Sequence, residues 1–329
     1  MPPPIRVIGA RAATAVGTRI YQAGAVVLAT GGITYPLTGS TGDGYAWAAA
    51  MGHQIVEPRP VLVPLLTNAP WVSGLAGLTL KNVAVSLWAG GGLADAPTDP
   101  AQEEAVAGVL AEETPPPAVG APTAGALTGA PVAETPARCL ASFQGEMLFA
   151  HFGLTGPIIL SLSRYYRRDL PLPVEARLDL KPALSPEVLD QRLRGDFDIY
   201  REKQLKNGMG DLLPRSLIPA VIQAAGLSGE QPLAELTRRQ RLRLGQVLKA
   251  LPMEIIGTRP PAEGIITAGG VALPEINAKT MASLKAAGLY LAGEMLDIDG
   301  FTGGYNLQAA FSTGWVAGES AAVFAAGDL

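Results

Sequence analysis

The stretch that decides the fold is Leu289-Tyr-Leu-Ala-Gly-Glu294, followed by Asp297-Ile-Asp-Gly-Phe-Thr-Gly-Gly-Tyr-Asn-Leu-Gln308. It predicts a strand, an acidic residue at the carboxyl end of that strand, a glycine-rich loop, and a helix from about Tyr305 to Phe324. Ligands of open α/β sheets bind outside the carboxyl ends of strands, and a helix N-terminus favours an anion or an electron-rich carbonyl. From spacing alone, an ordinary strand–loop–helix connection accounts for the pattern equally well.

A second buried strand is predicted near the start of the chain. Ala25-Val-Val-Leu28 is an unbroken apolar run before Thr30-Gly-Gly32, which is typical of a parallel strand covered on both faces. The Ala-rich segment Tyr45–Met51 predicts a helix that stops at Gly52. Its predicted N-cap is one of three residues, Ser40, Thr41 and Asp43.

Between these segments the apolar period changes twice. From Pro60 to about Pro182 it is two, as in Val83-Ala-Val-Ser-Leu87, which predicts antiparallel strands solvated on one side. The Ala- and Pro-rich segment 95–137 is predicted to be a flexible insertion.

Residues 185–251 are predicted to be helical. Pro186 suits a first helical position, and Thr237 with Gln240 forms a capping-box pattern. An apolar stripe at helical spacing follows, formed by Leu244, Val247, Leu248 and Leu251. After it, Gly264–Val271 predicts a strand that ends in a tight glycine turn.

Composition narrows the classes of function. The 329 residues are 48% hydrophobic and carry a net charge of −4, which argues against a nucleic-acid partner or an anionic membrane surface. The single cysteine, Cys139, and two histidines argue against a disulfide framework and a zinc enzyme, and fit a reducing, cytoplasmic compartment. No apolar run is long enough to span a membrane.

Five motifs occur in an order that resembles a known family. They are Ala29-Thr-Gly-Gly32, Thr38-Gly-Ser-Thr-Gly-Asp-Gly-Tyr45, Gly153-Leu-Thr-Gly-Pro157, Thr267-Ala-Gly-Gly-Val271, and the quoted run from Gly293 to Gln308. Together they resemble the aminoacetone oxidase-type (BaiN-like, YhiN-like) family of FAD-dependent oxidoreductases, from about Ala25 to the C-terminus apart from the insertion.

The resemblance implies an α/β fold of several domains, in which a Rossmann-like FAD-binding domain is split by insertions. The implied domains are 1–57 with 272–329 for FAD binding, 58–184 with 253–271 for a β-rich domain, and 185–252 for a small helical domain. The implied activity is transfer of hydride or electrons through FAD between a reduced nicotinamide, NAD(P)H, or a small organic donor and an acceptor. The implied partner is a small-molecule substrate.

The same resemblance implies which residues contact FAD. Gly293 and Glu294 would contact the ribityl and pyrophosphate portion, and the backbone N–H groups of Asn306 and Leu307 would face the N1/O2 edge of the flavin. The remaining implied contacts are Thr30, Gly31, Gly32, Gly42, Asp43, Gly303 and Gly304.

One family feature is missing from the sequence. Family members begin with a strand, a G-x-G-x-x-G turn and a helix that holds the FAD pyrophosphate, and nothing before Ala25 supplies this. Gly9–Gly17 has neither the spacing nor a preceding strand. The alternative hypothesis is therefore a truncated, non-catalytic fragment that does not retain FAD. An exposed sheet edge would then favour self-association into a homo-oligomer.

Two of four further sites admit two interpretations each, and the other two have one expected role each. His151 is either a proton donor on the substrate side of the flavin or a hydrogen-bonded structural histidine. His53 is expected to cap a helix C-terminus, and Cys139 is expected to be an inert thiol. The basic group Arg164, Arg167 and Arg168 either contacts NAD(P)H or forms a solvated face.

Overall fold

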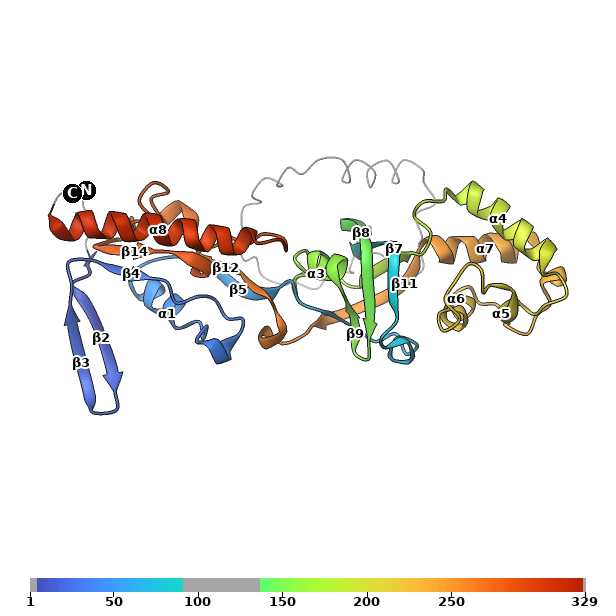
Figure 1. Cartoon of the computed structure of the whole chain (residues 1–329), viewed down its shortest axis with the longest axis horizontal. Coiled ribbons are helices and arrows are strands. Elements are labelled where there is room, and N and C mark those ends of the chain that lie inside the picture. The colour runs from blue at the N-terminus through green and yellow to red at the C-terminus, as the bar shows by residue number, and fades with distance from the viewer. Residues whose placement is uncertain (1–4, 91–136, 328–329) are drawn as a thin grey trace, which may run out of the picture. The chain divides into compact units, whose positions relative to one another are not determined.

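The computed structural model describes residues 5–90 and 137–327, which form two compact units (Figure 1). The first unit comprises Met1–Pro64 and Arg259–Leu329, and the second comprises Leu65–Thr258. The predicted flexible insertion, 95–137, lies outside the described residues except for Ala137. Among the residues that the structure describes, no helix is both long and apolar enough to cross a membrane.

The described residues of the first unit form two α-helices and eight short strands, besides short 3-10 helices. Its strands are β1 (Ile5–Arg6), β2 (Gly9–Thr14), β3 (Gly17–Gln22), β4 (Val26–Leu28), β5 (Ile55–Val61), β12 (Ile266–Val271), β13 (Ala286–Ala287) and β14 (Leu289–Leu291), and its helices are α1 (Asp43–Ala50) and α8 (Tyr305–Ala326). β4 pairs in parallel with β14, and β1 pairs in parallel with β13. The predicted parallel strand at 25–28 is therefore confirmed, but the expected coverage of both its faces was wrong, since Val27 is 38% exposed.

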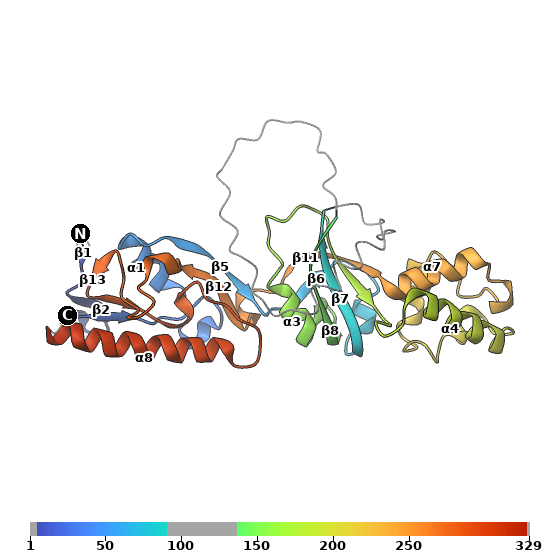
Figure 2. The ribbon, with the colours of Figure 1, turned by 90° about the horizontal axis from the view of Figure 1, so that it is seen from above.

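Two helices cover opposite faces of β14. Leu289 and Leu291 pack in one core cluster with Ala48 of α1, whereas the intervening Tyr290 packs in another cluster with Ala317 of α8. Successive side chains of a strand point to opposite faces, so this division places β14 between the two helices (Figure 1), and Figure 2 shows α1 and α8 on opposite sides of the unit. The predicted strand and long C-terminal helix are both confirmed.

The helix α1 ends as predicted, since Gly52, with φ 90°, directly follows its C-cap Met51, but it begins differently from the prediction. Its N-cap is Gly42, with φ 84° and no side-chain cap, and the Thr41 hydroxyl instead bonds the Asp43 carboxylate at 3.0 Å. The prediction of Ser40, Thr41 or Asp43 as the N-cap was wrong because this turn requires a positive φ, which glycine adopts without strain.

His53 closes the C-terminus of α1, as predicted, through its backbone. Its N–H donates to the Ala48 carbonyl at 3.1 Å, next to the bond from the Gly52 N–H to the Ala49 carbonyl at 2.9 Å. The buried ring has a second role that the sequence did not predict, because it joins the Glu275 carboxylate, 3.1 Å from Nδ1, to the Ser283 hydroxyl, 2.7 Å from Nε2.

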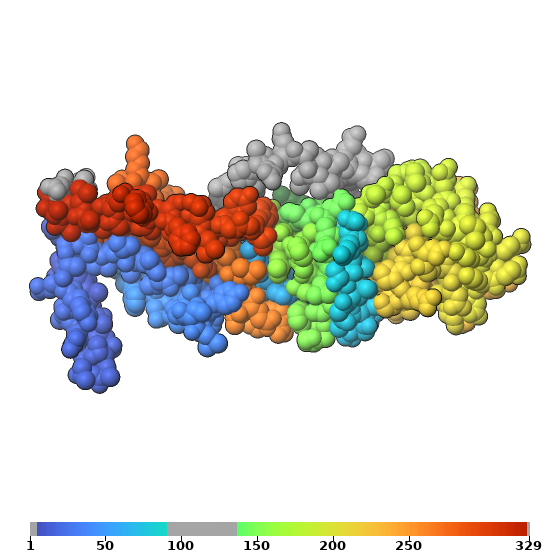
Figure 3. Space-filling model, viewed as in Figure 1, coloured from blue at the N-terminus to red at the C-terminus, as the bar shows by residue number. Residues whose placement is uncertain are grey.

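The strands β2 and β3 form an antiparallel hairpin that the sequence did not predict. Its side chains are mostly exposed, including Val16 at 85% and Ile20 at 74%. In Figures 1 and 3 the hairpin projects from the remainder of the first unit. The segment Gly9–Gly17, which the sequence rejects as a phosphate-binding turn, lies in this hairpin.

The second unit contains a closed, six-stranded antiparallel barrel in the order β10-β11-β6-β9-β8-β7. Its strands are β6 (Leu65–Thr67), β7 (Thr79–Ala89), β8 (Arg138–Ala150), β9 (Gly153–Thr155), β10 (Val174–Asp179) and β11 (Leu251–Thr258), and its helices are α3 (Pro157–Ser163), α4 (Pro186–Ile199), α5 (Leu205–Gly208), α6 (Ile218–Ala224) and α7 (Arg238–Lys249). The predicted antiparallel strands are confirmed.

The prediction that one side of each strand faces solvent was wrong for β10. Its alternate residues Glu175 and Arg177 are buried at 4% and 7% exposure, as are the apolar residues between them. The two charged groups form an ion pair, and the Arg177 guanidinium lies 4.5 Å from the Trp88 ring centroid. The two charged side chains can be buried here because each one is paired with an opposite charge.

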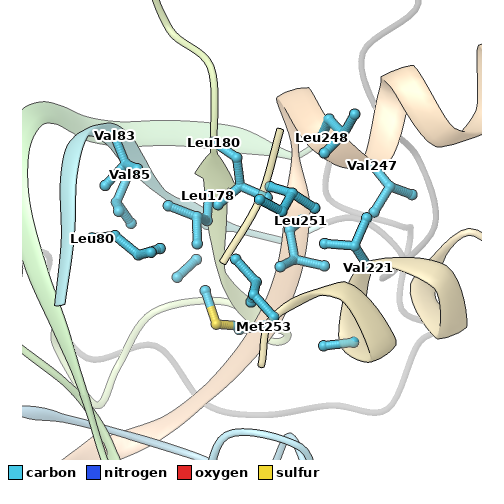
Figure 4. Close-up of a cluster of buried hydrophobic side chains, with 14 of the residues drawn as sticks. Leu80, Val83, Val85, Leu178, Leu180, Val221, Val247, Leu248, Leu251 and Met253 are labelled. Carbon is cyan, nitrogen blue, oxygen red and sulfur yellow. The ribbon is translucent and has the colours of Figure 1, made fainter. Parts of the chain in front are cut away.

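The helical part of the second unit begins as predicted. Ser185 caps α4 with Pro186 in its first turn, and Thr237 and Gln240 form the predicted capping box of α7. Leu251, predicted as part of the helical stripe, is instead the first residue of β11, because α7 ends at Lys249. Barrel and helices share one core, in which side chains of β7, β10, α6, α7 and β11 meet (Figure 4).

Candidate cofactor site

A cavity of about 350 Å³ lies in the first unit at the N-terminus of α8. Its lining comes from the carboxyl end of β14, the loop before α8, the first turns of α8, and apolar residues next to β5 and β12. The lining residues are Leu62, Ile265, Ile266, Gly293, Glu294, Ile298, Phe301, Thr302, Gly303, Gly304, Asn306, Leu307, Ala309 and Ala310. Ligand pockets typically measure about 300–1,000 Å³, so this volume suits a planar ring system rather than a whole dinucleotide.

The first turn of α8 presents unpaired donors to this cavity. Gly304 is the N-cap with φ 92° and has no side-chain cap. The first intrahelical bond is from the Gln308 N–H to the Gly304 carbonyl, and no acceptor among the described residues binds the N–H groups of Tyr305, Asn306 and Leu307. These groups and the helix dipole place partial positive charge at the end of the cavity formed by α8.

The Asn306 side chain holds the loop before α8 in place. Its Oδ1 accepts a hydrogen bond from the Gly300 N–H at 2.7 Å, and its Nδ2 donates to the Gly300 carbonyl at 3.0 Å. These two hydrogen bonds between the Asn306 side chain and the Gly300 backbone close the loop. The backbone N–H of Asn306 takes no part in them, and its orientation is set by the helix. The side chain therefore has a positioning role that the sequence did not predict.

Glu294 joins three segments of the first unit. Its Oε1 accepts hydrogen bonds from the Thr267 N–H at 2.6 Å and from the Thr34 hydroxyl at 3.1 Å. A Cβ at Gly32 would lie 2.7 Å from this same oxygen and 2.1 Å from Thr267 Oγ1. Residue 32 must therefore be glycine, because Thr267 and Glu294 approach its Cα closely. One carboxylate oxygen of Glu294, a predicted ligand contact, is already hydrogen-bonded within the protein.

Thr30 carries an unsatisfied buried hydroxyl. Its Oγ1 is buried and has no hydrogen-bond partner within the described part of the chain. The next residue, Gly31, has φ 74°, and a Cβ at Gly44 would lie 2.0 Å from the same hydroxyl. Since buried polar groups are nearly always paired, this hydroxyl suits a ligand that supplies the missing partner.

The eleven predicted contacts divide into two groups. Six of them line the cavity: Gly293, Glu294, Gly303, Gly304, Asn306 and Leu307. The other five lie outside its lining: Thr30, Gly31, Gly32 and Gly42 in the segment between β4 and α1, and Asp43 as the first residue of α1. Gly32 adjoins Glu294, as described above, whereas Asp43 is exposed at the start of α1.

Comparisons with known proteins identify the family of the chain. Residues 8–320 match the model of the HI0933-like protein Rossmann domain. The chain belongs to the HI0933-like family. This is the FAD-dependent family that the five motifs resemble, so the resemblance is confirmed over most of the chain.

Individual HI0933-like relatives are distant. The chain is 28% identical to a 3-dehydro-bile acid delta(4,6)-reductase of Clostridium scindens, over 92% of this chain and 63% of the relative. It is 26% identical to a ribosomal RNA dihydrouridine synthase of Haemophilus influenzae over 91% and 61%, and 27% identical to one of Escherichia coli over 88% and 58%. The chain thus spans about three fifths of the length of these curated relatives.

The sequence missed the apolar wall of this HI0933-like site. Leu62 is almost fully buried and has φ 51°, and Ile266 is 8% exposed. The Ile265-Ile266 pair directly before the Thr267-Ala-Gly-Gly motif was the available signal, but its proximity to the glycine-rich loop arises only from the fold.

Two ionisable groups beside Glu294 have shifted pKa values. Burial raises the pKa of Tyr45, and the charges of Glu294 and Asp297 raise it further, so its hydroxyl stays neutral and lies 3.5 Å from the Glu294 carbonyl. Burial also raises the pKa of Asp297, as does the neighbouring charge of Asp299. The carboxyl group of Asp297 therefore lies in an environment that disfavours its charged form.

His151 lies in the second unit, in the exposed turn between β8 and β9. Its ring packs edge-on against Phe152 with the centroids 5.0 Å apart, and it forms no hydrogen bond with the residues that the structure describes. The interpretation as a hydrogen-bonded structural histidine was therefore wrong. The proton-donor role stays a prediction.

Proposed function

We propose that this HI0933-like protein is an FAD-dependent oxidoreductase whose 350 Å³ cavity receives the flavin ring. The observation that supports this best is the first turn of α8, where three unpaired N–H groups adjoin a cavity with apolar walls. The buried, unpaired Thr30 hydroxyl and the close approach at Gly32 fit a further contact with the same cofactor.

When bound, FAD would supply the hydride or electron transfer. The chain's own contribution is electrostatic and steric. The N-terminus of α8 stabilises negative charge that develops beside it, by about 0.3–1 kcal/mol at an exposed site and more where water is excluded. Leu62, Ile266 and Phe301 provide the apolar surface that excludes water, and Asn306 holds the loop in position.

We further propose that the substrate contains a carbon–carbon double bond conjugated to a carbonyl group. Two of the relatives' names describe the saturation of such bonds, in a 3-oxo steroid acid and in a uracil base. A helix N-terminus suits this chemistry, because negative charge moves onto the carbonyl oxygen as hydride adds to the double bond. The reductant in this proposal is NAD(P)H or a small organic donor.

The second candidate is a non-catalytic protein that does not retain FAD. One observation favours it: Glu294 Oε1, an implied FAD contact, already accepts hydrogen bonds from the Thr267 N–H and the Thr34 hydroxyl. An absorption spectrum of the purified chain, followed by FAD titration and by anaerobic addition of NADPH, distinguishes the two candidates. Flavin bands that bleach with NADPH support the first, whereas a folded, colourless protein that takes up no FAD refutes it.

Self-association and a cytoplasmic location belong to the same proposal. Leu307, Phe311 and Trp315 are 63%, 70% and 71% exposed and follow one another at i, i+4, i+8 on α8. Such a stripe of large apolar side chains is typical of an interface. We propose that a second copy of the chain covers it.

A further inference from the structure

The helical part of the second unit contains a polar cavity of about 590 Å³ that the proposed redox function does not use. It lies between the C-terminal end of α4, α5, and the N-terminal end of α6. The residues that carry its chemistry are Tyr200, Lys203, Lys206, Gly210, Asp211 and Arg215.

Three cations and one carboxylate line this cavity, and two of the cations are not neutralised. The Lys203 ammonium lies 4.1 Å from the Tyr200 ring centroid, a contact that positions the charge without cancelling it. Arg215 is exposed and forms no ion pair within the described ranges, 5–90 and 137–327. Lys206, by contrast, forms an ion pair with Glu230 at 2.5 Å.

The carboxylate of Asp211 is already engaged as an acceptor. The Tyr200 hydroxyl donates a hydrogen bond to it, and this bond raises the pKa of Tyr200, so the phenol stays neutral. The Gly210 N–H has no acceptor among the described residues and offers a backbone donor beside the two cations. The cavity therefore has unsatisfied donors and a local excess of positive charge.

A packed core fixes the positions of these groups. Leu205, Met209 and Leu212 are buried under the cavity, and the N–H of Lys206 donates to the Gly229 carbonyl at 3.1 Å. A Cβ at Gly208 would lie 2.3 Å from Leu233, so the backbone is tightly packed there. The cations are thus attached to an ordered frame.

Local charge differs from the charge of the whole chain. Residues 185–251 contain eleven Lys and Arg against eight Asp and Glu, although the chain as a whole has a net charge of −4. The expectation of no nucleic-acid partner rested on that overall value. A local excess of positive charge, together with unpaired hydrogen-bond donors in a cavity, is typical of sites that bind phosphate oxygens.

We propose that this cavity binds the phosphate ester of a nucleotide, separately from the flavin site. Two sources carry this chemistry, the backbone of single-stranded RNA and the free dinucleotide NADPH. Lys203 and Arg215 are the expected phosphate contacts, with the Gly210 N–H as a third donor. Binding of RNA would imply that the proposed reduction acts on a base within RNA. Only this implication rests on the proposed function; phosphate binding itself does not.

The test uses the full chain and needs no redox activity. Binding of a fluorescent 12-nucleotide oligouridylate and of NADPH is measured by anisotropy and by NADPH fluorescence at about 0.1 M salt. Lys203→Gln/Arg215→Gln is compared with Arg239→Gln/Arg243→Gln, which removes the same charge from exposed positions of α7. On a single strand each phosphate contact contributes about 0.7 to the salt slope, or roughly five-fold at 0.1 M salt.

We expect the cavity pair to bind one of the two ligands about 25-fold more weakly, with a salt slope lower by about 1.4 for RNA, and the α7 pair to change less than two-fold. Loss with oligouridylate alone identifies an RNA backbone, and loss with NADPH alone identifies a free dinucleotide. Equal losses in the two pairs, or binding of neither ligand by the wild-type chain, would overturn the proposal.

A second measurement avoids the risk that the cavity pair does not fold. In the wild-type chain, lysine acetylation is mapped by mass spectrometry with and without the ligand. Protection of Lys203 and Lys206 but not of the exposed Lys81 supports the site. Uniform protection, or none, refutes it. Because neither readout involves flavin, a colourless protein can still pass both.

Discussion

The buried ion pair of β10 allows the stability of the second unit to be predicted in detail. Arg177→Met removes a guanidinium whose side chain is 7% exposed and leaves the Glu175 carboxylate, 5% exposed, without its partner. Removing one partner of a buried ion pair costs about 3–5 kcal/mol. Glu175 Oε2 already lacks a hydrogen-bond partner among the described residues, so no second donor can compensate. We expect a loss near the upper end of this range.

The loss should depend on pH. Burial raises the pKa of Glu175, and the hydrogen bond and charge of Arg177 counteract this. Without Arg177, the folded-state pKa rises further above the unfolded value of about 4.3. A group whose folded pKa is raised contributes stability below the unfolded pKa and loses it as pH rises through the folded pKa. The deficit of the variant should therefore be largest near pH 8 and shrink towards pH 5.

Urea unfolding at several pH values, with hydrogen exchange of β7 and β10 peptides as a local readout, measures this deficit. The matched control is Glu175→Leu/Arg177→Met, which removes both charges and is expected to be close to wild type or more stable. An equal loss in the single and double variants would show that packing against Trp88, rather than charge, stabilises β10. A deficit that is the same at all pH values would also refute the reasoning.

Three further predictions concern the first unit. Thr30→Val should leave the apo chain as stable or stabilise it by about 1 kcal/mol, because it removes an unpaired buried hydroxyl, and should weaken FAD binding about five-fold or more in a fluorescence titration. Burial lowers the pKa of His53, so its contribution to stability should be present above the unfolded pKa of about 6.5 and lost as pH falls below it. The melting temperature should therefore differ less between pH 5.5 and pH 7.5 in His53→Gln than in wild type. Phe311→Glu/Trp315→Glu should convert an oligomer into a monomer in light scattering, whereas a monomeric wild-type chain would contradict the proposed interface.

The sequence by itself determined the elements whose signals are local. The unbroken apolar runs before Thr30 and Gly293 identified β4 and β14, which pair in parallel. Of the two, β14 is buried on both faces, whereas Val27 of β4 is exposed. Thr237 with Gln240 identified the start of α7, because a capping box is satisfied within four residues of chain. The order of the glycine motifs identified the family and six residues of the cavity lining.

Only the tertiary structure decided the features that depend on distant contacts. His53 joins Glu275 and Ser283 across more than 200 residues of chain, and Leu62 meets the loop before α8 in the cavity wall. The charged face of β10 is buried because the barrel and its surroundings enclose both sides of the strand, which an alternating pattern cannot reveal. The glycine-rich run from Gly293 to Gln308 predicted a helix N-terminus. Only the fold brings apolar residues from distant segments next to that N-terminus and so forms the cavity.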